Sequence, residues 1–216
     1  MKRQLRAILP AFLFGSLFLL QIMACDCSAQ SDSAPVPVQA SGKVIFGPFE
    51  FVSPQGYWYF PRTYPEKGLT AGGTFVVTFF QTKDDIPTKR DKSEFPKHVF
   101  LNFYVYSSKF DDVQSYYDAV LSARRSRGIS NDEFSYKDLP EKTKALFNNM
   151  PDWSCREETI KQLHPLFAIN CVTLGEAGVI QMSAHGEEEK AVLAKASLLR
   201  DTMLSLKINR SGRLGN

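Results

Sequence analysis

The segment from Trp153 to Leu174 constrains the fold more than any other part of this chain. Two runs with the composition of β-strands, 153–160 and 166–174, flank Leu163, which predicts a hairpin. With Leu163 at the centre of the turn, Cys155 and Cys171 are equally far from it and therefore face each other. The pattern predicts a disulfide between them, which would close a loop of about 17 residues and stabilise the fold by roughly 3 kcal/mol.

The N-terminus has the pattern of a secretory signal peptide over residues 1–24. Lys2, Arg3 and Arg6 precede a largely apolar stretch. An uncleaved membrane anchor is the alternative, because the apolar run is close to the roughly 17 residues that can span a bilayer. Small residues after the run favour cleavage.

Two cleavage sites compete. The sequence IMAC, which ends at Cys25, resembles the lipobox of bacterial lipoproteins except at Met23, and would make Cys25 a lipidated first residue. Cleavage after Ala29 would instead leave Cys155 and Cys171 as the only cysteines, an even pair for an oxidising compartment. Residues 25–42 are predicted to form a flexible tether, which favours the lipoprotein.

The charge balance does not favour nucleic acid as a partner. The net charge of +3 lies in the signal segment, and the chain from Cys25 onward carries 23 basic and 23 acidic residues. We expect a protein of the bacterial periplasm or a membrane-anchored protein of the envelope. Its expected contacts are an unknown envelope protein or small ligand, and the membrane through a lipid anchor.

Residues 43–208 have the composition of a single globular domain, followed by a frayed tail at 209–216. Seven segments are rich in β-branched and aromatic residues and predict strands at 44–51, 57–60, 75–82, 99–106, 153–160, 166–174 and 179–185. Both faces of 99–106 are largely apolar, with Asn102 as the polar exception, which predicts a central strand covered on both sides.

Three helices are also expected. Apolar residues recur at helical spacing from Val113 onward, and Asp111 and Asp112 suit the beginning of that helix. Asp138, as an N-cap before Pro140, predicts a short helix to about residue 149, and residues 187–206 predict one long amphipathic helix. The expected fold is α+β: an antiparallel sheet of about six or seven strands with helices packed on both faces.

The segments FEFVSPQGYWYFP (49–61), GVIQMSAHG (178–186) and SLKI (205–208) resemble, in order and texture, the Mog/PsbP-like group. The resemblance spans most of residues 46–208. It implies an antiparallel sheet between helices, in a group of binding and assembly factors of photosystems, nuclear transport and bacterial envelopes. It implies no shared catalytic residues.

The residues give no recognisable catalytic or metal-binding motif, and no cofactor is expected. His98, His164 and His185 have no metal-ligand spacing. His185 ends a strand, where it could cap the next helix or lie in solvent. Cys155 as a nucleophile, with His164 or His185 as its base, is weaker than the disulfide. Neighbours on a strand point to opposite faces, so Glu157 and Glu158 are not expected to line one cleft.

Tyrosines give the chain its binding character. Tyr57, Tyr59, Tyr104 and Tyr106 suit partner contacts, with packing beneath the helices as the alternative. The charged loop 82–97 is the other candidate binding element. We expect an exported cell-envelope binding or assembly protein without catalytic activity. The alternative is an exported enzyme whose site is assembled from scattered polar residues around His185 and the loop carboxylates.

Overall fold

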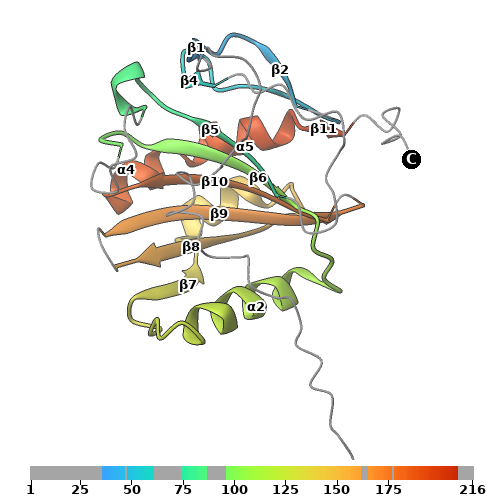
Figure 1. The fold of residues 1–216 in the computed structure, drawn as a ribbon, viewed down its shortest axis with the longest axis vertical. Coiled ribbons are helices and arrows are strands. Elements are labelled where there is room, and N and C mark those ends of the chain that lie inside the picture. The colour runs from blue at the N-terminus through green and yellow to red at the C-terminus, as the bar shows by residue number, and fades with distance from the viewer. Residues whose placement is uncertain are drawn as a thin grey trace, which may run out of the picture.

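The computed structural model describes residues 36–46, 48–60, 74–86, 96–161, 165–176 and 178–208. Its centre is a six-stranded sheet in which all neighbouring strands are antiparallel (Figure 1). The strands lie in the order β5 (Thr74–Phe79), β6 (Phe100–Tyr106), β10 (Gly178–Gly186), β9 (Leu166–Gly175), β8 (Ser154–Ile160), β7 (Phe134–Asp138). The predicted α+β class with an antiparallel sheet is confirmed.

The two strongest strand predictions are also confirmed. Strand β6 lies between β5 and β10, and every residue in it except Tyr106 is buried, as expected for a central strand. Strands β8 and β9 form the predicted hairpin, with Cys155 directly opposite Cys171. The disulfide joins these two residues, whose Cα atoms are 4.0 Å apart.

A second, smaller sheet lies beyond β5 at the top of Figure 1. It consists of β11 (Lys207–Ile208), β3 (Phe49–Val52) and β2 (Lys43–Phe46). The prediction of one strand over 44–51 was wrong, because the chain reverses so that Phe46 pairs with Phe49. Pro48, which has no backbone N–H, lies in this turn and could not donate to a continuous ladder.

The N-terminal strand β1 (Val38–Gln39) pairs with β4 (Trp58–Tyr59). Trp58 also bridges to Phe80, just after β5, so this pair is connected to the large sheet. Both β1 and Ala40, which is only 2% exposed, lie within the range 25–42 that was predicted as a tether. Ordered structure therefore extends into that range.

The helix predictions were correct in place but not in detail. Helix α2 (Val113–Arg125) begins as expected, with the Asp112 carboxylate accepting from the Ser115 N–H at 2.6 Å. The second helix is short, α3 (Glu141–Lys144) followed by the 3₁₀ turn η2 (Ala145–Phe147), and its N-cap is Pro140. The prediction of Asp138 as the cap was wrong. Asp138 is the last residue of β7, a strand that the sequence pattern missed, and it pairs there with Arg156 of β8.

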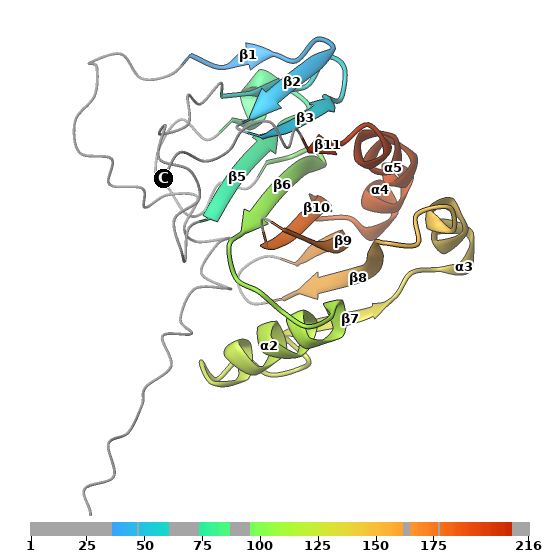
Figure 2. The same cartoon turned by 90° about the vertical axis from the view of Figure 1, so that its right-hand side faces the viewer.

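The predicted long C-terminal helix is two helices, α4 (Glu189–Ala194) and α5 (Ala196–Leu204), separated at Lys195. A further 3₁₀ turn, η1 (Lys83–Asp85), follows β5. In Figure 2 the helices α3, α4 and α5 lie together along the sheet, and α2 lies beside β7 at its far edge. In the part of the chain that the structure describes, no helix is both long and apolar enough to cross a membrane.

Residues of β9 alternate between two apolar clusters, as a strand requires. Ile169 and Cys171 pack in the larger cluster, which includes the inner side chains of the small sheet and of α4 and α5. Leu166 and Val172 pack in the smaller cluster with Tyr116 and Tyr117 of α2. The sheet therefore buries side chains on both of its faces.

Candidate binding face on the six-stranded sheet

A row of polar side chains crosses the middle of the sheet, on the face opposite the disulfide. Asn170 of β9 is directly opposite Ser183 of β10, Ser183 is opposite Asn102 of β6, and Asn102 is opposite Thr78 of β5. Directly opposed residues have their Cβ atoms about 5 Å apart and project from the same face. We call this row, together with its neighbours Glu158 and His185, the polar face.

The polar face is buried except at Thr78, which is partly exposed. Ser183 is fully buried, and Asn170, Asn102, His185 and Glu158 are 1%, 2%, 4% and 6% exposed. Three hydrogen bonds connect its members in pairs: Asn170 Nδ2 donates to Glu158 Oε2 at 2.6 Å, Thr78 Oγ1 donates to Asn102 Oδ1 at 2.7 Å, and Ser183 Oγ lies 2.7 Å from His185 Nε2.

Each pair leaves one polar atom without a partner among the described residues. These atoms are Asn170 Oδ1, Asn102 Nδ2 and His185 Nδ1. A buried polar atom that makes no hydrogen bond destabilises a fold by about 1–3 kcal/mol, so native proteins contain few of them. Asn170 and Asn102 oppose Ser183 from either side, and His185 is two residues from Ser183 on the same strand, so the three atoms lie on one sheet face, where they could bond to a bound molecule.

One buried carboxyl belongs to this face. Burial raises the pKa of Glu158, while its hydrogen bond from Asn170 and the positive charge of Arg124 oppose that shift. Arg124 is on α2 and is itself 9% exposed, with its guanidinium 4.0 Å from the centre of the Phe134 ring. Its Nε also makes no hydrogen bond among the described residues. Glu158 therefore has a cation nearby.

Tyrosines border the polar face on the side of α2. The hydroxyl groups of Tyr116 and Tyr106 both point to Gln181 Oε1, at 3.0 and 3.4 Å. Tyr104 and Tyr106 stack with their ring centres 5.9 Å apart. Burial, and then the neighbouring Tyr106 hydroxyl, raises the pKa of Tyr104 well above its usual value. These tyrosines are neutral hydrogen-bonding groups at physiological pH.

The four tyrosines predicted to bind a partner do not form one surface. Tyr57 and Tyr104 are 6% and 4% exposed, which agrees with the packing alternative, and Tyr59 and Tyr106 are partly exposed. Tyr59 packs against Phe46 and Phe79 in the larger cluster. A role for these residues in partner binding stays a prediction.

His185 does not lie in solvent, as one interpretation of the sequence allowed. It is buried, it stacks on Phe100 at 5.2 Å between ring centres, and burial lowers its pKa to about 4. Its neutral ring is hydrogen bonded to the Ser183 hydroxyl. A neutral imidazole that contacts a serine hydroxyl can act as the base of a Ser–His–Asp triad. The third member is missing among the described residues, because no carboxylate contacts His185 Nδ1 there.

A separate Asp–His pair lies near the end of β5. Asp85 accepts from Thr82 Oγ1 at 2.8 Å, from the Lys97 N–H at 3.0 Å and from His98 Nδ1 at 2.9 Å. Burial alone would raise the pKa of Asp85, but the hydrogen bonds from Thr82 and His98 and the His98 charge lower it. The pair attaches the base of the 82–97 loop to β6, while residues 87–95 lie outside the described residues.

Several predicted sites fall outside the described residues, namely Cys25, Cys27 and His164. Glu157 and Glu158 lie on opposite faces as predicted: Glu158 contacts Asn170, whereas burial and the nearby Glu189 raise the pKa of Glu157. Within the described ranges, no cluster of three or more His, Cys, Asp or Glu side chains could hold a metal ion.

Comparison with protein-family models and with curated proteins found no match.

The sequence patterns did not identify Asn102, Asn170 and Ser183 as members of one site. Each is a polar residue inside a run of apolar strand residues, and this signal could have singled them out. Their convergence depends on which strands are neighbours, and the strands containing Asn102 and Asn170 are far apart in sequence.

Proposed function

We propose that this protein is an exported binding or assembly protein of the bacterial cell envelope that acts without catalysis. The observation that carries the proposal is the polar face, where Asn170, Asn102 and His185 are buried on one side of the sheet and each has an atom without a hydrogen-bond partner among the described residues. The Cys155–Cys171 disulfide supports an oxidising compartment outside the cytoplasm.

The proposal includes a lipid anchor at Cys25 after removal of residues 1–24. The support is the lipobox-like sequence and the polar segment that follows it. The intact mass of the protein from native membranes tests this part, because an acylated chain that begins at Cys25 and a free chain that begins at Gln30 differ in mass. A chain beginning at Gln30 would refute the anchor and leave the export proposal standing.

The proposal also includes a Mog/PsbP-like arrangement with helices on both faces of the sheet. The two apolar clusters support it, since α2 packs with one set of β9 residues and α4 and α5 pack with the alternate set. The resemblance would place the chain in a group of binding and assembly factors.

The binding role is tested by substituting Asn102. Asn102→Leu keeps the number and branching of the side-chain heavy atoms and removes the amide that has no partner among the described residues, while Thr78 is partly exposed and its hydroxyl can bond to water. Thr173→Val, on the other face of β9, is the matched control. We expect the protein purified from its native envelope to carry a bound species in native mass spectrometry. Asn102→Leu should lose that species and remain folded, and equal occupancy in both variants would contradict the role of the polar face.

An exported hydrolase is the second candidate, and the Ser183–His185 contact favours it. An activated serine reacts with a fluorophosphonate probe, whereas an ordinary serine does not. Stoichiometric labelling that is lost in Ser183→Ala would establish the hydrolase, and the absence of labelling in the folded native protein would exclude it.

A further inference from the structure

Exposed large hydrophobic side chains gather at one end of the domain. Among the described residues they all lie in segments 36–52 and 204–208. They are Val36 (70% exposed), Val38 (38%), Ile45 (60%), Val52 (54%), Leu204 (53%) and Ile208 (46%). We call this group the apolar end.

Contacts between the two segments bring these residues to the same region. The Val52 N–H donates to Ser205 Oγ at 2.8 Å, and Lys207 pairs with Glu50. Figure 2 shows β1, β2, β3 and β11 together at the top of the molecule, with the end of α5 beside them. Large apolar side chains in a patch of this kind usually mark an interaction surface.

Strand register shows that Ile45 and Val52 lie on the outer face of the small sheet. Their strands bury the alternate residues, including Phe49, against the larger cluster, so the outer positions face away from the core. Ile45 is opposite Glu50, and Val52 is opposite Lys43. A sheet with one solvated face normally has polar residues there, and these two positions break that rule.

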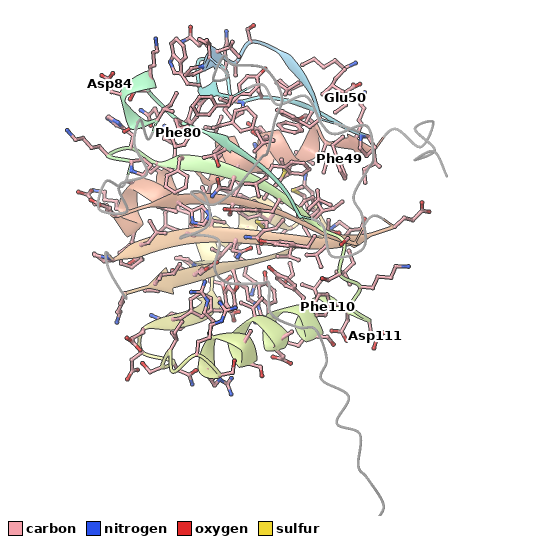
Figure 3. All side chains as sticks on the ribbon, in the orientation of Figure 1. Phe49, Glu50, Phe80, Asp84, Phe110 and Asp111 are labelled. Carbon is pink, nitrogen blue, oxygen red and sulfur yellow. A yellow bond between two sulfur atoms is a disulfide. The ribbon has the colours of Figure 1, made fainter. Side chains whose placement is uncertain are left out.

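Charged side chains surround the apolar residues on this outer face. Lys43 pairs with Glu50 at 2.7 Å, and Lys207 lies in the same cross-strand row as Glu50. Figure 3 labels Glu50 beside the buried Phe49 on β3. Two lysines and one carboxylate leave this face with a positive balance, which suits contact with anionic headgroups.

The chain outside the described structure indicates what covers the apolar end. Ten residues separate Cys25 from Val36, the first described residue. Ten residues reach at most about 40 Å when fully extended, and a random coil of that length averages about 20 Å. A domain of this size is itself about 40 Å across. Because the average reach is about half the width of the domain, a lipid at Cys25 favours the surface around β1 to β3 as the side nearest to the bilayer.

We propose that the apolar end rests on the membrane surface, with Ile45 and Val52 in the interfacial layer and the two lysines at its headgroups. This inference rests on the lipid anchor of the proposed function. Amphipathic surfaces bind membranes in this way, through buried apolar area and attraction to anionic lipids. The contact would fix the orientation of the domain and leave the α2 side facing away from the bilayer.

The experiment uses the mature lipidated chain with Cys27→Ser, so that one new thiol can carry an environment-sensitive nitrobenzoxadiazole dye. The dye is placed at Val52→Cys or, as the matched control, at Asp111→Cys, an exposed position beside α2 and away from Glu50 (Figure 3). The proteins are anchored in vesicles of phosphatidylethanolamine and phosphatidylglycerol, and the Cys25→Ser forms of both serve as the states in solution.

We expect dye emission at position 52 to rise roughly two-fold or more on anchoring, and to be quenched by spin-labelled lipid, because the site enters a less polar layer. The dye at position 111 should change little. Equal responses at the two positions would overturn the inference while leaving the lipid anchor intact. A rise at position 52 in solution that depends on protein concentration would show that a second copy covers the patch instead. A chain that begins at Gln30 would overturn the anchor and the inference together.

Discussion

Reduction of the Cys155–Cys171 disulfide is expected to lower the free energy of unfolding by about 3 kcal/mol. The two cysteines are 16 residues apart in sequence, and the bond closes a loop of about 17 residues in the unfolded chain. In the folded state, strand pairing already holds the two residues opposite each other, and Cys171 is fully buried. The effect of the bond therefore lies mainly in the entropy of the unfolded chain.

Urea and thermal unfolding of the oxidised and reduced protein measure this difference. For a domain of this size, 3 kcal/mol corresponds to a shift in melting temperature of roughly 6–12 °C. Cys155→Ala combined with Cys171→Ala is the control, because its stability should not respond to reductant.

The reasoning would be refuted if the oxidised and reduced proteins unfolded within about 0.5 kcal/mol of each other while intact mass showed that the bond was present and then broken. That result would mean that the unfolded chain already keeps the hairpin together.

Three other predictions follow from single residues. Gly178 has a φ of 115°, and a Cβ there would overlap the Tyr106 carbonyl, so Gly178→Ala should cost about 3 kcal/mol or more in urea unfolding. Gly128 also has a positive φ, 79°, but nothing lies within 4 Å of a Cβ there, so Gly128→Ala should cost only about 1–2 kcal/mol. Equal losses of stability in the two variants would contradict an overlap at Gly178. Asp85→Asn should destabilise by about 2–3 kcal/mol, because Asp85 accepts charge-assisted hydrogen bonds, whereas the exposed Asp84→Asn should change stability by less than about 0.5 kcal/mol. Because the pKa of Asp85 is lowered in the folded protein, the stability lost in Asp85→Asn should be fully present above the carboxyl pKa of the unfolded chain and should shrink as the pH falls through the lower folded pKa. A loss that grew in acid would refute this prediction. Burial lowers the pKa of His185 from 6.5 to about 4, so the unfolded chain takes up a proton before the folded protein does as the pH falls. The free energy of unfolding should therefore fall by about 3 kcal/mol between pH 6.5 and pH 4. An NMR titration that finds the imidazole charged at pH 5.5 in the folded protein would contradict this.

Local patterns in the sequence were sufficient for the hairpin, the central strand and the first helix. The two halves of a hairpin are close in sequence, so the turn fixes which residues face each other, and Cys155 opposite Cys171 followed from that symmetry. The apolar residues on both faces of β6 indicated that it is covered on both sides. Asp112 could be recognised as a helix cap because capping involves only neighbouring residues.

The polar face and the apolar end were decided by tertiary structure. Asn102 meets Ser183 only because β10 pairs with β6, and Ile45 shares an end with Leu204 only because β11 joins β3. Such pairings between distant segments depend on how the whole core packs, and no short pattern encodes them. The sequence by itself determined the β8–β9 hairpin with its disulfide, the central strand and the Asp112 cap. The burial of His185 and the convergence of polar atoms that have no partner among the described residues required the assembled sheet, since each depends on neighbours contributed from elsewhere in the chain.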